Sequence, residues 1–475
     1  MAQFPFVGPS YSPRAKNLDA QQCINLYPEV GGTTSKTVMA LLGTPGLALW
    51  ATLAGGSVRG LLRFSDTLAV AVCGPNVYSL TTNGASTLLG TISNGTSPVS
   101  MASNGTIIML VTGPAGYVVD PVAKTVTQIT AEAFTGADCV DFIDGYFVFN
   151  QPGSGRFQIT GLYSSDIDEL DFATAEGSPD NIVSLLVDHR ELWLFGSNST
   201  EVYFNSGNAD FPFERIAGAY IEQGCAATHS VAKADNSVFW LTADDRGKGM
   251  VMRSVGYQPQ RVSDHALEYA LSQYTTVSDA VAYTYQQEGH SFYVLVLPTA
   301  NVTWTYDISS GMWHQRAWRN PADGSMNRHR ANTHMAFAGE NIVGDWEAGK
   351  LYRLDLDVFT DNGDPVARVR TCPHLSDPDY RYQIFDSLQL DMQVGVGLPS
   401  GQGSDPKAML QWSTDGGYTW SNELWASMGK LGDRRARVKW RRLGRSRDRV
   451  FKVVITDPVR VVIVGASVTV RTGAA

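Results

Sequence analysis

Short apolar runs separated by turn residues recur along most of the chain, and residues 182–221 show the pattern most clearly. Apolar or alternating segments cover Ile182–His189, Arg190–Ser197, Thr200–Gly207 and Phe213–Ile221, with polar turn residues at each join. Alternation with a period of two residues is the pattern of a half-buried β-strand, and short polar joins are typical of hairpins. The segment therefore predicts one antiparallel sheet of four strands.

Similar units precede and follow this segment at a period of roughly 40 to 50 residues. In three of them a turn at Ser65–Asp66, Asn104–Gly105 or Asp144–Gly145 introduces a strand apolar enough to be buried on both faces. Repeated four-stranded units of this length are typical of a β-propeller. We predict an all-β fold in which residues 57–372 form a β-propeller-like body of six or seven blades. A short helix is expected at Asp264–Tyr274, capped by Ser263 or Asp264.

The two ends of the chain depart from this repeat. Residues 1–56 are punctuated by prolines and lack a clear period, which predicts an extended N-terminal arm, packed on its own domain or touching a neighbouring subunit. Residues 373–383 are expected to be a linker. Long alternating strands in residues 384–475 predict a β-sandwich-like domain. The alternative is that this last part joins the flanking strands of the propeller in one interleaved domain.

Composition agrees with a folded all-β protein. The 475 residues are 43% hydrophobic and 17% charged, and they include 46 glycines, which together disfavour disorder and favour many tight turns. Five scattered cysteines without a CxxC motif predict buried, reduced thiols. No signal peptide is visible and no apolar run reaches the length of a membrane span, so no stable membrane insertion is expected.

Charge is distributed unevenly. Residues 384–475 carry 14 Lys or Arg and 8 Asp or Glu, a net charge of +6. The whole chain has a net charge of −9, so residues 1–383 have a net charge of −15. The basic residues concentrate between Arg434 and Lys452, where they alternate partly with apolar residues and predict a strand pair with one basic face. That face would meet DNA phosphates or an acidic subunit, or would be a solvated edge. The candidate interaction residues are Arg434, Arg435, Arg437, Arg441, Arg442, Arg445 and Arg447.

No set of residues indicates catalysis. Ser413–Trp420 matches the Asp-box pattern S-x-D-x-G-x-T-W, which is a folding motif: its glycines permit the turn and Asp415 accepts backbone N–H groups. The histidines stand apart and form no metal-ligand pattern, and no nucleophile elbow or phosphate-binding loop is present. We therefore expect no catalytic residues, no cofactor-binding residues, no metal ligands and no enzymatic activity.

Four stretches of the chain resemble one viral protein family. They are Ser10–Glu29, Leu41–Leu47, Ala175–Cys225 and Tyr306–Arg316, and their order and spacing span residues 10 to about 375. In these stretches the sequence resembles the packaged-DNA stabilisation proteins, also called tail hub or tail nozzle proteins, of podoviruses, the short-tailed bacteriophages, that infect enteric bacteria.

The resemblance implies a structural virion protein of the phage tail, assembled in the cytoplasm of the bacterial host. Such a protein forms a tube with other copies of itself, expected to be a homo-hexamer, and closes the portal vertex. It helps to retain packaged DNA and conducts the double-stranded genome during ejection. The partners implied are the portal-adaptor (head-to-tail connector) protein, a tail fibre or tailspike, and the tail needle or plug.

Two other functions are compatible with the residues. A glycan-binding or glycan-cleaving propeller on a phage tail, of the sialidase or lectin kind, is supported by the Asp-box and the many aromatic residues. A virion scaffold that never touches DNA is the other.

Overall fold

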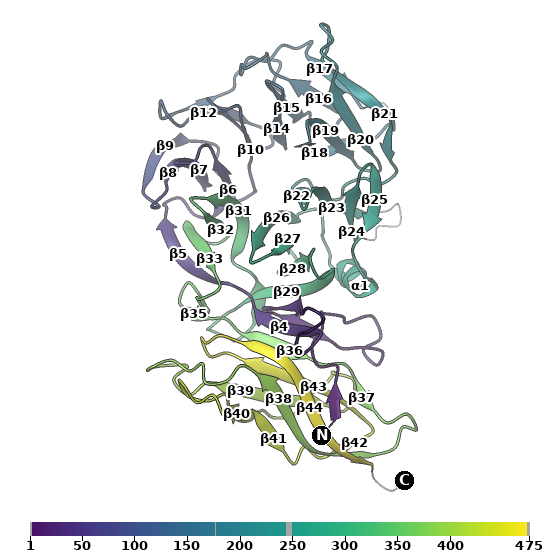
Figure 1. Cartoon of the computed structure of the whole chain (residues 1–475). Helices are drawn as coiled ribbons and strands as arrows, with labels where there is room; N and C mark the ends of the chain where they lie inside the picture. Colours follow the sequence, from purple (N-terminus) through teal and green to yellow (C-terminus); the bar gives the residue numbers. More distant parts are fainter. Residues whose placement is uncertain (1, 176, 244–248, 473–475) are drawn as a thin grey trace.

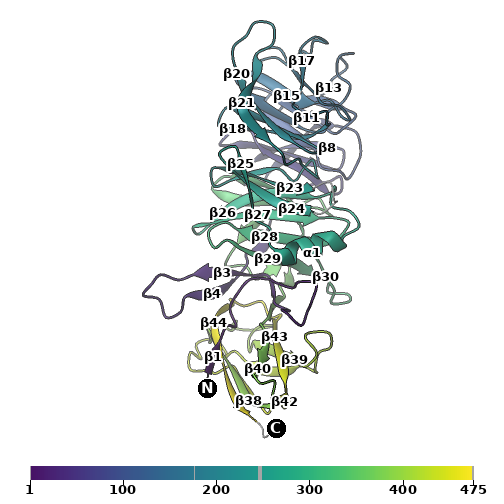
Figure 2. The same cartoon turned by 90° about the vertical axis from the view of Figure 1, so that its right-hand side faces the viewer.

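The computed structural model describes residues 2–175, 177–243 and 249–472 and shows two domains, one below the other in Figure 1. The larger domain is a ring of small antiparallel sheets, seen edge-on in Figure 2. The smaller domain contains the last strands of the chain and lies against the rim of the ring, so it leaves both flat faces of the ring uncovered.

Five blades of the ring are separate four-stranded sheets in the described residues. Their strands are β6 (Val58–Arg63), β7 (Leu68–Cys73), β8 (Asn76–Thr81) and β9 (Ser86–Thr91); β10 (Ser100–Ser103), β11 (Ile108–Val111), β12 (Gly116–Asp120) and β13 (Thr125–Gln128); β14 (Val140–Ile143), β15 (Tyr146–Asn150), β16 (Arg156–Ile159) and β17 (Phe172–Thr174); β18 (Ile182–Asp188), β19 (Glu191–Gly196), β20 (Thr200–Asn205) and β21 (Phe213–Ile221); and β22 (Ala232–Ala234), β23 (Ser237–Ala243), β24 (Gly249–Val255) and β25 (Gln258–Arg261).

Two further four-stranded units belong to larger sheets, which brings the described blades to seven, within the predicted range. One contains β26 (Val281–Gln287), β27 (His290–Leu297), β28 (Val302–Asp307) and β29 (Met312–Arg319). The other contains β31 (Ala331–Phe337), β32 (Glu340–Asp345), β33 (Lys350–Asp355) and, from the beginning of the chain, β5 (Gly46–Thr52). Because β5 pairs antiparallel with β33, an early strand completes the last blade and closes the ring.

The core of the propeller lies between neighbouring blades. The second strands are mostly apolar and mostly buried, as in β7 and β11, because side chains on both of their faces meet another blade. Val70 and Val72 of β7, for example, pack with Ile108 and Leu110 of β11 in one apolar cluster. Helix α1 (His265–Gln273) is capped by Asp264, whose carboxylate accepts the Leu267 N–H at 2.8 Å, and this confirms the predicted helix.

The C-terminal domain is a β-sandwich whose two sheets both include strands from the first 43 residues.

The strands outside the blades lie in the sandwich or extend the sheets of the last two blades. They are β1 (Ala2–Phe4), β2 (Gln22–Ile24), β3 (Leu26–Val30), β4 (Met39–Gly43), β30 (Met326–Arg328), β34 (Thr360–Asp361), β35 (Asp364–Pro365), β36 (Arg368–Thr371), β37 (Leu375–Ser376), β38 (Gln383–Met392), β39 (Lys407–Ser413), β40 (Leu424–Ser427), β41 (Lys439–Arg441), β42 (Arg445–Ser446), β43 (Asp448–Ile455) and β44 (Val462–Thr472).

Residues 1–56 are not an extended arm. Strands β1 and β4 pair with β44, β2 pairs with β29 and β36, and β5 belongs to the last blade. Phe6, Cys23 and Leu26 lie in the core of the sandwich. The prolines punctuate short strands that pack on their own chain and supply part of the sandwich core.

The prediction that residues 373–383 form a linker is also wrong. Strand β36 already pairs with β43, and β37 lies inside residues 373–383 and pairs with β43 as well. The chain therefore enters the sandwich between β35 and β36. The interleaved alternative describes this junction better, because one eleven-stranded sheet runs from the blade of β26–β29 through β2 and β36 into the sandwich strands β43, β39 and β40.

Asn25 ties the two domains together at this junction. Its side chain is 1% exposed, donates to the carbonyl oxygens of Ala317 and Ala367 at 2.7 Å each, and accepts the Ala317 N–H at 2.9 Å. Its backbone adopts φ 54°, a left-handed conformation that asparagine tolerates better than most residues. One residue thus satisfies buried backbone groups of β29 and of the segment that leads into the sandwich.

We predict that Asn25→Ala lowers the free energy of unfolding by about 3–5 kcal/mol, because it leaves buried backbone groups without partners and places alanine at positive φ. Urea unfolding of the full chain measures the change. Asn83→Ala is the control, since Asn83 makes its hydrogen bonds in an exposed hairpin turn. Equal loss in the two variants would contradict the role given to Asn25.

Candidate functional site

The seven arginines singled out in the sequence are all exposed. Strands β41 and β42, which hold or adjoin four of them, lie on the side of the sandwich away from the propeller (Figure 1). We call these residues the basic strip: Arg434, Arg435, Arg437, Arg441, Arg442, Arg445 and Arg447. The first three lie in the loop before β41, and the others lie in or beside β41 and β42. The strip therefore gathers positive charge on one accessible region.

The strip is not a strand pair. Both β41 and β42 pair with β38, and neither pairs with the other. Val438, Trp440 and Leu443 are buried between the exposed arginines, which confirms the expected division between a basic and an apolar side. Arg445 and Arg447 both lie over the ring of Tyr382, with guanidinium carbons 5.1 and 4.7 Å from its centroid.

Other basic residues of the same run are structural. Arg449 is buried, donates to the Leu443 carbonyl at 2.7 Å and lies over the ring of Phe385 at 4.6 Å. Burial lowers the pKa of Arg449 to about 10. Sequence alternation did not separate this residue from its exposed neighbours, because the run around it carries an arginine at nearly every second position.

The Asp-box behaves as a turn motif. Asp415 accepts the backbone N–H groups of Tyr418 and Thr419 at 3.0 and 2.9 Å and the hydroxyl of Thr419 at 2.6 Å. These hydrogen bonds, with that from Ser413, hold the pKa of the carboxyl well below its usual range. The motif closes the loop between β39 and β40 in the sandwich and takes no part in the propeller.

A channel of three adjoining cavities runs along the axis of the propeller. The middle cavity has a volume of about 440 Å³ and is lined by the first strands of the blades. One mouth opens into a cavity of about 950 Å³ around the ends of those strands, and the other into one of about 410 Å³ around their beginnings. Sequence reasoning missed the channel, since its lining comes from positions far apart in the chain.

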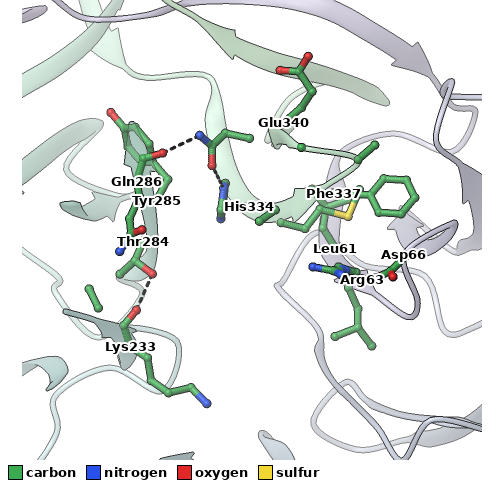
Figure 3. Close-up of a pocket in the computed structure, with 17 residues that line it drawn as sticks. Leu61, Arg63, Asp66, Lys233, Thr284, Tyr285, Gln286, His334, Phe337 and Glu340 are labelled. Atoms are coloured by element: carbon green, nitrogen blue, oxygen red, sulfur yellow. Dashed lines mark hydrogen bonds and ion pairs between the residues drawn. The ribbon is translucent and has the colours of Figure 1, made fainter. Parts of the chain in front are cut away.

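Figure 3 shows the wider mouth. Leu61 and Phe337 form an apolar side, whereas Arg63, Lys233 and Glu340 bring charges of both signs to the rim. The Thr284 hydroxyl donates to the Lys233 carbonyl at 2.6 Å. His334 contacts the Asn341 side-chain oxygen at 2.9 Å. These polar groups already have partners within the chain.

Four histidines are held neutral: His314 and His329 are buried in the core, and His229 and His334 are half-buried in the lining of the channel. Burial lowers the pKa of His229 and His334 to about 4, and it lowers the pKa of His314 and His329 further, with nearby arginines adding to the effect at both. A buried imidazole resists protonation because the charged ring would lose its hydration. The five cysteines are buried thiols, and burial raises the pKa of each, to about 11 at Cys225.

Within the described ranges, no group of three His, Cys, Asp or Glu side chains could hold a metal ion. No described helix is both long and apolar enough to cross a membrane.

The neutral histidines predict that acid weakens the fold. Between pH 6.5 and 4 the unfolded chain binds protons at these rings and the folded chain does not, so stability falls as pH falls through that window. His334→Gln should reduce the difference in unfolding free energy between pH 7 and pH 5 by about 2 kcal/mol. Urea unfolding at both pH values tests this, with His265→Gln on the exposed side of α1 as control. An unchanged difference in His334→Gln would contradict it.

Comparisons with solved structures return matches at low sequence identity. The WD40 β-propeller domain of Doa1 is 13% identical, with a TM-score of 0.41 over 65% of this chain and 96% of that one. The computationally designed Ika8 protein is 14% identical, with a TM-score of 0.38 over 71% and 100%. The extracellular domain of the putative hybrid two-component system BT4673 from B. thetaiotaomicron is 11% identical, with a TM-score of 0.46 over 65% and 39%. None of these likenesses bears on function.

A search of curated protein sequences finds no match. Family models are decisive by contrast. The model of the bacteriophage P22 Gp10 β-propeller matches residues 2–359, and the model of the bacteriophage P22 Gp10 β-sandwich matches residues 368–471. The second match begins at β36, where the chain enters the sandwich, and residues 360–367, which include β34 and β35, separate it from the first. The chain therefore belongs to the bacteriophage P22 Gp10 family of phage stabilisation proteins.

Proposed function

We propose that this protein is the tail hub, or nozzle, of a short-tailed phage. In this role it closes the portal vertex after packaging, helps to retain the genome and conducts DNA during ejection. The observation that carries the proposal is the succession of two matches to one phage structural family over both domains. The role is structural, and the Asp-box in the sandwich, with its carboxylate occupied by its own turn, gives no support to a sialidase-like reaction.

The DNA conduit in this proposal runs between copies of the chain. The middle cavity of one propeller, at about 440 Å³, has the volume of a small-molecule site and is lined by side chains of the blades. A duplex needs far more room, since its major groove alone is about 12 Å wide. A ring of subunits, expected to be a hexamer, would enclose a wider tube.

The proposed partners follow from the same role. They are other copies of this chain, the portal-adaptor protein, a tail fibre or tailspike, the tail needle or plug, and the double-stranded genome in transit. The virion tail is the proposed location, reached by assembly in the cytoplasm of the host. The basic strip and the acidic remainder of the chain favour contacts between unlike surfaces.

For the basic strip we favour an acidic protein surface over DNA, because arginines that gripped phosphates along the conduit would slow ejection. The test replaces Arg441, Arg442, Arg445 and Arg447 with glutamine in phage particles. We expect heads that fail to take up the protein, measured by tail completion on DNA-filled heads. The matched control makes the same change at four exposed propeller arginines, Arg63, Arg156, Arg190 and Arg215.

DNA retention is scored separately in the same particles. Complete tails that leak DNA or eject it abnormally would assign the strip to phosphate contacts. Normal tail assembly together with normal DNA retention would show that the basic strip is only a solvated edge of the sheet. Failure of this protein to enter tails at all, in its unaltered form, would overturn the proposed function itself.

A further inference from the structure

One loop of the propeller exposes large apolar side chains that nothing in the described chain covers. It comprises residues 161–171, between β16 and β17, and we call it the 161–171 loop. Leu162, Tyr163 and Leu170 are 58%, 68% and 77% exposed. Single exposed apolar residues are common, whereas three such residues gathered in one short segment are typical of a surface that binds another protein.

The 161–171 loop is held in one conformation by its own contacts. The Gly161 N–H donates to the Asp166 carbonyl at 2.9 Å, and the Tyr163 N–H donates to the Gly145 carbonyl at 2.6 Å. The side chain of Ile167 packs against the apolar cluster between the second and third blades. Because these contacts fix the loop before a partner arrives, little entropy is lost when its exposed side chains are covered.

The same loop carries negative charge that has no basic partner in the described chain. Four carboxylates lie within six positions, and none of them forms an ion pair with a described residue: Asp166, Asp168, Glu169 and Asp171. Two arginines lie on neighbouring segments, and both have other partners. Arg156 lies over the ring of Phe172 at 4.6 Å, and Arg190 pairs with Asp144 at 2.8 Å. The loop therefore offers a surface that is both apolar and acidic.

The basic strip has the opposite charge and the same lack of partners. None of its seven arginines forms an ion pair with another residue of the described ranges. Apolar groups are exposed beside it as well: Tyr382, under Arg445 and Arg447, is 40% exposed, and Leu431, just before the strip, is 63% exposed. Arginine and aromatic residues are enriched in protein interfaces. The strip thus complements the 161–171 loop in charge and resembles it in exposed apolar surface.

The two surfaces lie at opposite ends of one chain. Strand β17, directly after the loop, lies at the end of the ring farthest from the sandwich, whereas β41 and β42 lie on the side of the sandwich away from the propeller (Figure 1). The loop and the strip of one chain therefore cannot meet, and a contact between them joins two copies. Contacts between unlike surfaces of identical subunits close into a ring when the rotation between neighbours permits.

We propose that the basic strip of one copy binds the 161–171 loop of the next copy. The proposal rests on the proposed ring of identical subunits and names the surfaces by which the subunits meet. Leu162, Tyr163 and Leu170 supply apolar anchors, and the loop carboxylates accept hydrogen bonds from arginines of the strip around them. DNA would neutralise the strip but would be repelled by the loop, so it accounts for only one of the two surfaces.

Charge reversal in a tail-completion assay tests the contact. DNA-filled heads that lack this protein are incubated with purified full-length variants, and completed tails are counted. The loop variant carries Asp166→Lys and Glu169→Lys, and the strip variant carries Arg441→Glu and Arg445→Glu. Each should lower tail completion about tenfold, because like charges then face each other across the contact. The chain that carries all four changes should complete tails again, since its reversed loop meets the reversed strip of its neighbour.

A mixture of variants tests the closed ring. Equal amounts of the loop variant and the strip variant should also complete tails if the ring has an even number of subunits, as a hexamer has. When the two variants alternate, each reversed surface meets a reversed partner and each unaltered surface meets an unaltered one. Glu222→Lys with Glu288→Lys is the matched control, because both glutamates are exposed and lie in other blades.

An apolar substitution separates the anchors from the charges. Leu170→Ser should lower tail completion without lowering the melting temperature, because Leu170 is mostly exposed in the single chain. Thermal melts also confirm that every charge variant is folded before tails are counted.

Normal tail completion by the loop variant or by the strip variant would overturn the contact and would leave the tail-hub role intact, because the unaltered protein would still enter tails. Loss in both variants without recovery in the four-change chain would also overturn it, and would assign the strip to DNA or to an acidic surface of another tail protein. Failure of the unaltered protein to complete tails would overturn the tail-hub role and this contact together.

Discussion

Hydrogen bonding of buried backbone at the junction of the two domains is the constraint on which the rest of the structure depends. The chain passes between propeller and sandwich twice, once before β5 and once after β35. Each passage buries backbone groups that water cannot reach, and an unpaired buried group is costly. Strand β2 meets part of this need by pairing with β29 on one side and β36 on the other.

Two side chains complete the junction where strand pairing ends. Asn25 bonds to Ala317 and Ala367, and Arg370 donates to the carbonyl oxygens of Phe6 and Pro9 at 2.6 and 2.8 Å. Arg370 is fully buried, and burial lowers its pKa. A guanidinium is suited to this place because its several donors reach separate carbonyls from one fixed position. The arginine thus organises the irregular segment of residues 6–22 against the sandwich.

The repeat of the propeller could be predicted from sequence because it is local. A polar turn followed by a buried strand is visible in Asp144–Gly145 and the residues after it, whatever the rest of the chain does. The pairing of β5 with β33 joins residues about three hundred positions apart, and no local pattern encodes it. For the same reason the sequence predicts an arm at residues 1–56, because a proline-rich stretch shows no period until the partners of its short strands are known.

For the basic strip and the channel, too, the sequence predicts what depends on neighbouring residues and misses what depends on residues far apart in the chain. Exposed arginines of the basic strip could be found from composition, since a dense run of charge cannot all be buried. Burial of Arg449 within that run could not, because it depends on the rings of Phe385 and Trp412, which come from other strands. The residues that line the axial channel, among them Asp279, Arg328 and Asn332, come together only when the ring closes.

The continuous sheet between the domains has a mechanical consequence. Because the eleven-stranded sheet crosses from one blade into the sandwich, the two domains cannot rotate without breaking strand pairs. Strands β41 and β42, which carry part of the basic strip, are therefore held at a fixed place relative to the propeller ring. A rigid body with separated charges can present unlike surfaces in one fixed orientation, as the proposed ring of identical subunits would require.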